Sequence, residues 1–387
     1  MNVYAAPNQL DVPILAWGNE AIIRTVVWST EPVTEAEPRW PLPIQDPVSG
    51  RQDLYERLVW VPDTDVILYL HGHSSRAEEG ENLAKQLIAD AKKRNRRLSV
   101  VAFDWPNCGY SSHLHPAQIG KQLPIDTKQG HNFFALDYYD EVVKQLVGQM
   151  HLEGRLLAVV GGSLGGNMVL RLAQQRARAE NPWIRNLVAW NPAGAWSSYY
   201  FDPFKEAGAL PRVRVRVEQE DNGLERRREY FEQVYASDVW IFGVPIAKKK
   251  IDQSDHWYRQ DWLPCRDNLR VTSMLDRVEI YNTRFRTWHW RMAFEQLVIS
   301  HLENDCAEFC PPQGKEPWRS MRGPLLLLDG KDDPDLHKPT VELAGKLASV
   351  RGMTGAHRTV NATGHSIHDE RPAWLSGTIL DFCPARR

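Results

Sequence analysis

The stretch RLLAVVGGSLGGNMVLRLAQQ, residues 155–175, decides the fold around which the rest of the chain is built. Its five apolar residues at 156–160 predict a buried strand, and the six residues GGSLGG follow directly. An apolar stripe at four-residue spacing then predicts the buried face of a helix: Leu164, Met168 and Leu172. A strand that turns sharply into a helix leaves Ser163 on a tight turn, at a helix N-terminus whose amides favour negative charge. This is the position of a nucleophile.

The pattern G-x-S-x-G is weak by itself, because glycine and serine are common in turns. The alternative interpretation is a glycine-rich connection between a strand and a helix, with no chemistry. The strand before the pattern and the helix after it favour the nucleophile elbow, since that motif requires this context.

The composition is that of a globular protein: 387 residues, 42% hydrophobic, 25% charged, with a formal net charge of −2. Nothing in this balance points to nucleic acid or to an anionic membrane surface as a partner. No segment approaches the roughly 18 consecutive apolar residues of a membrane span. The N-terminal residues lack the basic region and apolar core of a secretory signal, and five cysteines do not form a disulfide framework. We therefore expect a cytoplasmic protein.

Strand and helix patterns alternate along the first half of the chain. Two β-like runs at 21–28 and 58–61 predict an antiparallel edge that leads into a larger sheet. Apolar runs then predict strands at 65–70, 98–103, 156–160 and 187–190, with helical patterns at 79–93 and 132–150 and after the GGSLGG turn. This order is typical of a parallel sheet covered by helices.

The alternation stops after residue 194 and resumes near residue 322. Between them lie helical patterns rich in tryptophan and arginine. Beyond them the chain predicts a strand at 324–329, a helix at 339–350, a strand at 358–362 and a helix at 372–382. We therefore predict an α/β core formed by residues 1–194 and 322–387, with residues 195–321 inserted into it as a mainly helical block.

A serine nucleophile needs a base near neutral pKa and a third group that orients the base. In open α/β sheets such groups lie beyond the carboxyl ends of strands. The predicted strand at 324–329 runs into an acidic loop with three candidates, and the strand at 358–362 runs into Gly364 and His365. The candidates in the acidic loop are Asp332, Asp333 and Asp335. The chain order of serine, acid and histidine is the one expected of this elbow.

The chain resembles the α/β-hydrolase superfamily over roughly residues 55–194 and 322–387. Five pieces of the family pattern recur in order: the HG-x loop at 71–73, the D-x-P-G-x-G-x-S segment at 104–111 with Asn107 replacing a glycine, the elbow at 161–165, the G-x-x-D motif at 330–333, and the G-H-x-x-x-x-E-x-P motif at 364–372.

The resemblance implies an α/β-hydrolase fold, a mostly parallel sheet with helices on both faces, in which residues 195–321 form a cap over the site. It implies Ser163 as nucleophile, His365 as general base and then acid, and Asp333 as the orienting carboxylate. The oxyanion hole would use the backbone N–H groups of Leu164 and His73. Asp332 and Asp335 remain alternatives for the acid.

The inserted block offers an aromatic cluster for substrate binding. It lies nearest the sheet edge and could line an apolar pocket for an acyl or aromatic group: Trp196, Tyr199, Tyr200 and Phe201. The alternative is that these side chains form the cap's own core. His301, Cys306 and Cys310 are too irregularly spaced to predict a metal site.

These features together predict a serine hydrolase that cleaves small-molecule carboxylic esters through an acyl-enzyme, without metal or organic cofactor. We expect no nucleic-acid partner and no membrane span, and the sequence is compatible with a homo-oligomer. A serine nucleophile argues against dehalogenase or epoxide-hydrolase chemistry, for which the family uses aspartate.

Two other functions stay open. The GGSLGG elbow is similar to the GGSMGG elbow of homoserine O-acetyltransferases, which would make the chain an O-acyltransferase. The other is a non-catalytic hydrolase fold that acts as a binding module.

Overall fold

The structure of this chain is a computed structural model, and the following residues are described in it. They are 8–16, 19–31, 34–35, 40–45, 52–55, 58–72, 75–106, 110–112, 136–177, 184–195, 238–241, 244–247, 316–333 and 336–385.

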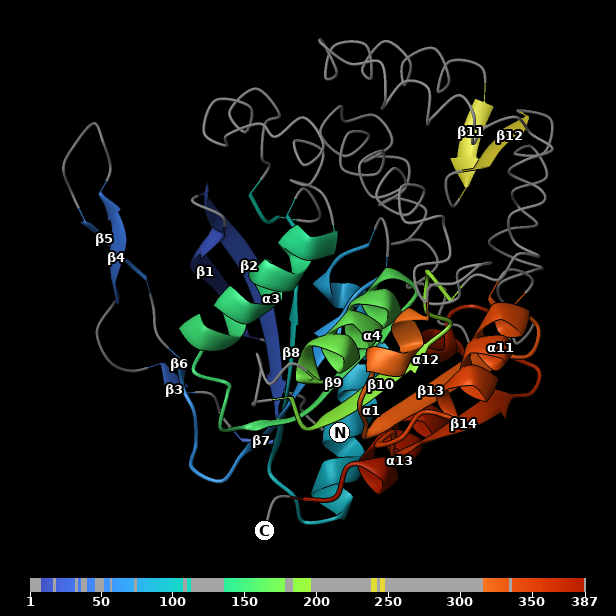
Figure 1. Ribbon diagram of the computed structural model, residues 1–387. Coiled ribbons are helices and arrows are strands. Elements are labelled where there is room, and N and C mark those ends of the chain that lie inside the picture. The colour runs from blue at the N-terminus through green and yellow to red at the C-terminus, as the bar shows by residue number, and fades with distance from the viewer. Residues whose placement is uncertain are drawn as a thin grey trace, which may run out of the picture.

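Eight of the described strands form one central sheet (Figure 1). They are β1 (Asn8–Ala16), β2 (Asn19–Ser29), β7 (Asp65–Leu70), β8 (Leu98–Phe103), β9 (Leu156–Gly162), β10 (Asn186–Trp190), β13 (Leu325–Gly330) and β14 (Gly355–Val360). Their spatial order is β1-β2-β8-β7-β9-β10-β13-β14. The six strands from β8 to β14 run parallel, whereas β1 and β2 form an antiparallel edge.

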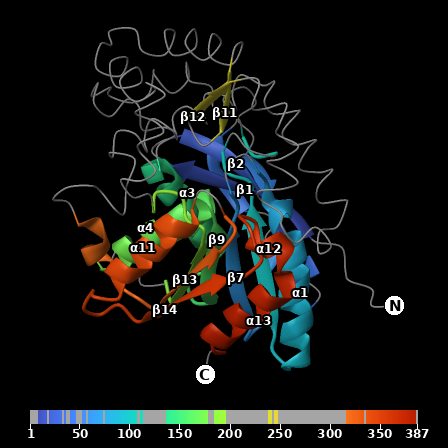
Figure 2. The same cartoon turned by 90° about the vertical axis from the view of Figure 1, so that its right-hand side faces the viewer.

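Helices cover both faces of this sheet, as Figure 2 shows. They are α1 (Glu81–Lys93), α3 (Leu136–Gln149), α4 (Leu164–Ala177), α11 (His337–Leu347), α12 (Ile367–Glu370) and α13 (Pro372–Phe382), with 3-10 turns η1 (Ala77–Gly80) and η5 (Pro317–Ser320). Apolar side chains of α3, α4 and α11 pack in one core cluster, and those of α1 and α13 pack in the other.

Strand β7 shows why the central strands are apolar on both faces. Leu68 and Leu70 pack in the cluster with α3 and α4, whereas Ile67 and Tyr69 pack in the cluster with α1 and α13. Successive side chains of a strand point to opposite faces, so a strand covered on both sides needs an unbroken apolar run.

Short strands outside the central sheet form three pairs. These strands are β3 (Thr34–Glu35) with β6 (Leu58–Val59), β4 (Trp40–Gln45) with β5 (Gln52–Tyr55), and β11 (Asp238–Ile241) with β12 (Val244–Ala247). The last pair falls in the predicted cap. Most of residues 195–321 lie outside the described residues, so the helical character of that block stays a prediction.

The structure confirms the predicted fold class, a mostly parallel sheet with helices on both faces. Most strands lie within two residues of their predicted bounds, and α13 has the predicted ones. The run predicted at 58–61 is β6, which pairs with β3 outside the central sheet and is not part of its antiparallel edge. Two further differences concern edge strands. The sequence analysis did not predict β1, and β14 begins at Gly355, three residues before the predicted start. Five of the six residues of β14 are exposed, which explains why no apolar run marks its beginning.

Candidate active site

Ser163 lies on the turn between β9 and α4 with left-handed backbone geometry. Its φ is 54°, a conformation that L side chains rarely adopt and that stores strain. Three backbone hydrogen bonds hold it there: its N–H donates to the Trp190 carbonyl at 3.1 Å, and its own carbonyl accepts from the N–H groups of Asn167 and Ala193 at 2.9 Å. The sequence-predicted elbow is therefore a sharp and firmly held turn.

Glycines permit this turn because neighbouring backbone and a buried indole ring come too close there for a side chain. A Cβ on Gly165 would lie 1.9 Å from the carbonyl oxygen of Leu70, and a Cβ on Gly162 would lie 2.0 Å from the Trp190 indole nitrogen. Neither distance is compatible with a side chain. The two glycines let α4 and β10 close on the strand ends beside Ser163.

His365 and Asp333, which are predicted from separate loops, are in direct contact. The His365 Nδ1 lies 2.7 Å from Asp333 Oδ2, and both residues are buried. An ionised carboxylate can only accept hydrogen bonds, so Nδ1 donates in this pair, and the neutral form of the imidazole then has its lone pair on Nε2. The other oxygen, Asp333 Oδ1, accepts the N–H of Leu336 at 3.0 Å. This pair has the arrangement of a base with its orienting acid.

The neighbouring acid candidates differ from Asp333. Asp332 is exposed, and its backbone N–H donates to the Thr363 carbonyl at 2.9 Å. Asp335 lies outside the described residues. Ser163 follows β9, Asp333 follows β13 and His365 follows β14, so all three stand beyond the carboxyl ends of parallel strands in one sheet.

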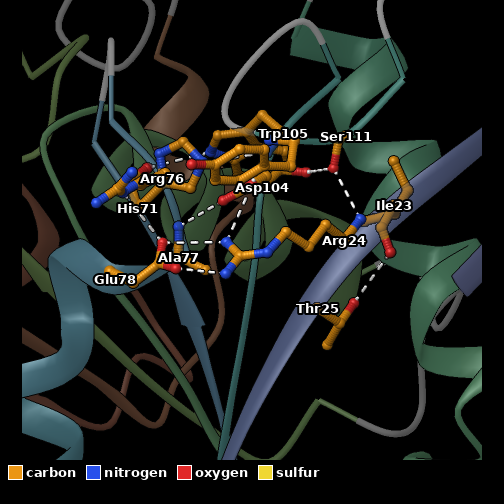
Figure 3. Close-up of polar contacts among 11 residues, drawn as sticks. Ile23, Arg24, Thr25, His71, Arg76, Ala77, Glu78, Asp104, Trp105 and Ser111 are labelled. Atoms are coloured by element: carbon orange, nitrogen blue, oxygen red, sulfur yellow. Dashed lines mark hydrogen bonds and ion pairs between the residues drawn. The ribbon is translucent and has the colours of Figure 1, made fainter. Parts of the chain in front are cut away.

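The first residues of the HG-x loop are fixed by hydrogen bonds to Trp105 (Figure 3). The Trp105 N–H donates to His71 Nε2 at 3.1 Å, so the His71 proton is on Nδ1, which donates to the Gly72 carbonyl at 2.7 Å. The Gly72 N–H donates to Glu79 Oε2 at 2.7 Å. A Cβ on Gly72 would lie 3.6 Å from the Cβ of Ser163, so this loop borders the elbow.

One of the two predicted oxyanion donors can be placed. Leu164 is the first residue of α4, where backbone N–H groups have no partner within the helix. His73 lies outside the described residues, as does the predicted aromatic cluster of the cap: Trp196, Tyr199, Tyr200 and Phe201.

An ion-pair network, visible in Figure 3, joins Arg24 of β2 to Glu78 and Asp104. These two acids precede Glu79 and Trp105, which bond to the HG-x loop. Arg24 pairs with Glu78 through both terminal nitrogens and with Asp104 Oδ2 at 3.4 Å. Asp104 also accepts the N–H groups of Ala77 and Tyr110, at 2.6 and 2.7 Å. Burial acts to raise the pKa of Glu78, but the hydrogen bonds and charge of Arg24 outweigh it, so this pKa lies below its ordinary value.

Glu370 holds the backbone on both sides of His365. Its carboxylate accepts the N–H of Gly364 at 3.0 Å and the N–H of Ser366 at 3.3 Å. Burial raises the pKa of Glu370 to about 7, against the opposing effects of these two N–H groups and of the His365 ring. The motif at 364–372 therefore contains a carboxyl group that titrates near neutral pH.

We expect Glu370→Gln to remove a pH dependence of stability. The proton on Glu370 stabilises the fold fully below its unfolded pKa of 4.5, and this contribution is lost as the pH rises through about 7. Over that window the wild type should lose about 3 kcal/mol of unfolding free energy relative to the variant. Denaturant unfolding at several pH values measures the difference. Glu342→Gln, on the exposed face of α11, should show no such trend, and a flat difference for Glu370→Gln would contradict the prediction.

Within the described part of the chain, no group of three or more His, Cys, Asp and Glu side chains could hold a metal ion. The residues His301, Cys306 and Cys310 lie outside it.

The helices of the described part of the chain were also compared with a membrane span, and none of them has the length and the apolar character that a span requires.

A family model described as "Alpha/beta hydrolase family" matches residues 67–378, which is most of the chain. The chain belongs to the alpha/beta hydrolase family. Comparison with curated protein sequences gives no match.

Solved structures similar to this alpha/beta hydrolase share its fold at low sequence identity. A mutant of the epoxide hydrolase from Solanum tuberosum is 13% identical, with a TM-score of 0.57 over 97% of this chain and 98% of that one. A laboratory-evolved variant of the potato epoxide hydrolase is 12% identical, with the same TM-score and coverage. Cfl2 from Burkholderia cenocepacia is 14% identical, with a TM-score of 0.51 over 99% of this chain and 98% of that one.

Sequence reasoning missed several residues that build the site of this alpha/beta hydrolase. Arg24 had a signal, since it is the one charged residue in the apolar run 21–28. A charged side chain in a buried strand needs an oppositely charged side chain near it. The sequence does not predict that Glu78 and Asp104 take this part. Asn191 directly follows the predicted strand at 187–190, and no local pattern marks it as part of the site.

Proposed function

We propose that this alpha/beta hydrolase is a serine hydrolase that cleaves carboxylic esters through an acyl-enzyme. The observation that carries the proposal is the 2.7 Å hydrogen bond between His365 and Asp333. It lies at the same edge of the sheet as Ser163, whose backbone has the strained geometry of a nucleophile elbow. A base with its orienting carboxylate, placed at the same edge of the sheet as an elbow serine, supports acyl transfer by these three residues.

In the proposed reaction, Ser163 Oγ attacks the ester carbonyl and His365 Nε2 takes the hydroxyl proton. The carbonyl oxygen becomes an oxyanion, which the N–H of Leu164, together with that of His73, stabilises. Each such donor contributes about 3 kcal/mol. The tetrahedral intermediate then expels the alcohol, which receives the proton from His365. Water, activated by the same imidazole, releases the acid and restores Ser163.

The epoxide chemistry of the structural neighbours is not carried over to this chain. Attack by a carboxylate on an epoxide gives an ester, which water can hydrolyse at its carbonyl. Attack by Ser163 would give an ether, which has no carbonyl and could not turn over. The serine at the elbow therefore favours substrates that themselves contain the acyl group.

Acyl transfer to an alcohol is the second candidate, and the GGSLGG elbow favours it. The same acyl-enzyme would form, and an alcohol would replace water in the second step. We propose that residues 195–321 form a cap and that Trp196, Tyr199, Tyr200 and Phe201 line the acyl pocket, which would set the acyl group accepted in either reaction.

A panel of p-nitrophenyl esters of increasing acyl length tests the proposed function. We expect hydrolysis in water alone, with a preferred chain length. Acyl transfer would instead require an added alcohol acceptor for turnover. If the protein neither hydrolyses esters nor transfers acyl groups, and a fluorophosphonate does not label it, the result would favour the non-catalytic binding module.

Asp333→Asn should lower kcat strongly, by up to about 10⁴-fold, because an amide at this position favours the wrong tautomer of His365. Asp332→Asn is the matched control, since its side chain is exposed on the same loop. We expect it to leave kcat within a few-fold of the wild type. The assignment of the acid fails if Asp332→Asn is the more damaging change.

A further inference from the structure

We propose that Asn191 is a positioning residue for this reaction. Its side chain ties the loops of Asp333 and His365 to the strand end beside Ser163. The inference rests on the proposed function, because it concerns the geometry of the same three residues.

Asn191 follows β10 directly and is fully buried. Its φ is 40°, in the left-handed region where asparagine is enriched among residues other than glycine. A buried side chain on such a backbone is retained only where the surrounding structure over-determines it. The hydrogen bonds of its amide group supply that constraint.

The amide of Asn191 uses both its donors and its acceptor. Nδ2 donates to the carbonyl of His365 at 2.8 Å and to that of Gly364 at 3.2 Å. Oδ1 accepts the N–H of Gly330 at 3.0 Å. Two carbonyl groups face the nitrogen and one N–H faces the oxygen, so only one orientation of the amide satisfies all three groups.

These contacts reach both proposed catalytic loops. One is made to the backbone of His365 itself. Another is made to Gly330, which begins the acid loop and whose carbonyl accepts the N–H of Asp333 at 3.1 Å. A shift of the Asn191 amide would therefore change the position of the imidazole relative to its carboxylate.

The same segment of chain also holds the elbow. The carbonyl of Trp190 accepts the N–H of Ser163, and the N–H of Ala193 donates to the Ser163 carbonyl. Residues 190–193 thus contact the backbone at Ser163 and, through Asn191, the loops of Asp333 and His365. Asn191 is the side chain through which this segment reaches both of those loops.

Loss of the amide should loosen these loops without unfolding them. Two backbone bonds that join the acid loop to the end of β14 and to the histidine loop do not involve Asn191: Lys331 N–H to the Val360 carbonyl at 3.0 Å, and Asp332 N–H to the Thr363 carbonyl at 2.9 Å. The His365–Asp333 pair would then sample a wider range of positions. A displacement of about 1 Å is enough to lower turnover about 100-fold.

Two variants of Asn191 separate its roles. Asn191→Gly deletes the amide and suits the positive φ, so it avoids the strain that alanine would add. Asn191→Asp keeps the shape and the acceptor for Gly330 but replaces the two donors to the histidine loop. Asn186→Ala is the matched control: Asn186 lies at the other end of β10 and donates to the Leu157 carbonyl at 2.7 Å.

The first measurement is steady-state hydrolysis of a p-nitrophenyl ester. We expect both Asn191 variants to lower kcat by about 10- to 100-fold with little change in KM. The bonds that they alter go to Gly330, Gly364 and His365, none of which is among the proposed pocket residues. Asn186→Ala should keep the wild-type kcat. A wild-type kcat in both Asn191 variants, or an equal loss in Asn186→Ala, would overturn the proposal.

The second measurement does not depend on turnover. The proton of His365 Nδ1 that is shared with Asp333 should give a low-field NMR resonance in the wild type and in Asn186→Ala. It should broaden or vanish in Asn191→Gly and Asn191→Asp. An unchanged resonance in both Asn191 variants would overturn the positioning role even if the protein hydrolyses esters. A wild type that shows the resonance but neither hydrolyses esters nor reacts with a fluorophosphonate would instead contradict the proposed function.

Discussion

Ser163→Ala should lower kcat for ester hydrolysis by about 10⁴- to 10⁶-fold and abolish labelling by a fluorophosphonate. In the proposed reaction the Ser163 hydroxyl forms the acyl-enzyme, so the variant lacks the nucleophile. Steady-state kinetics and gel-based labelling measure the two effects. Ser376→Ala is a suitable control, since Ser376 is also buried but bonds to Asp90, between α13 and α1.

The same position offers a test of the strained elbow. Glycine tolerates a φ of 54° at no steric cost, so Ser163→Gly should be as inactive as Ser163→Ala yet more stable than it by about 1 kcal/mol. A Ser163→Ala variant that keeps more than about a tenth of the wild-type activity would exclude Ser163 as the nucleophile.

His365→Ala should have an effect of similar size, a loss of about 10⁴- to 10⁶-fold in kcat. In the proposed reaction the imidazole takes the proton of Ser163 and returns it to the leaving alcohol, and the variant loses both steps. Because the two residues act as one unit, the double variant Ser163→Ala/His365→Ala should be hardly less active than either single variant. Steady-state kinetics of the three variants measure this non-additivity.

His357→Ala provides a matched control for that result. His357 on β14 also pairs with a buried aspartate, Asp329, but stands outside the proposed reaction. Its loss should cost stability and leave kcat near the wild-type value. Equal losses of kcat in His357→Ala and His365→Ala would show that the effect is structural and would remove His365 from its role as base.

The central strands were predictable because burial on both faces demands an unbroken apolar run. Strand β7, DVILYL, is buried at every position, and its predicted bounds hold. Strand β14, GAHRTV, lies at the edge of the sheet and is mostly exposed, so its first residues carry no apolar signal. Strand β1 alternates weakly and contains Pro13, which is tolerated at an edge but weakens the pattern.

The candidate site was predictable only where local motifs mark it. The glycines around Ser163 indicate that neighbouring groups approach too closely there for side chains. Gly364 marks the start of the loop that carries His365. The contact between His365 and Asp333 was expected from the order of the family motifs along the chain, and the structure shows it as a hydrogen bond of 2.7 Å. The roles of Asn191 and Arg24 depend on partners that are distant in the sequence, and no local pattern encodes such pairings.

Strands β10 and β13 lie side by side, although residues 191–324 separate them in the chain. During synthesis, the edge of β10 therefore stays unpaired for on the order of 10 s, until β13 has left the ribosome. An unpaired strand edge can pair with other chains, so a nascent copy is exposed to aggregation until residues 325–387 emerge. Asp333 and His365 belong to that segment, so the proposed active site stays incomplete until translation is nearly over.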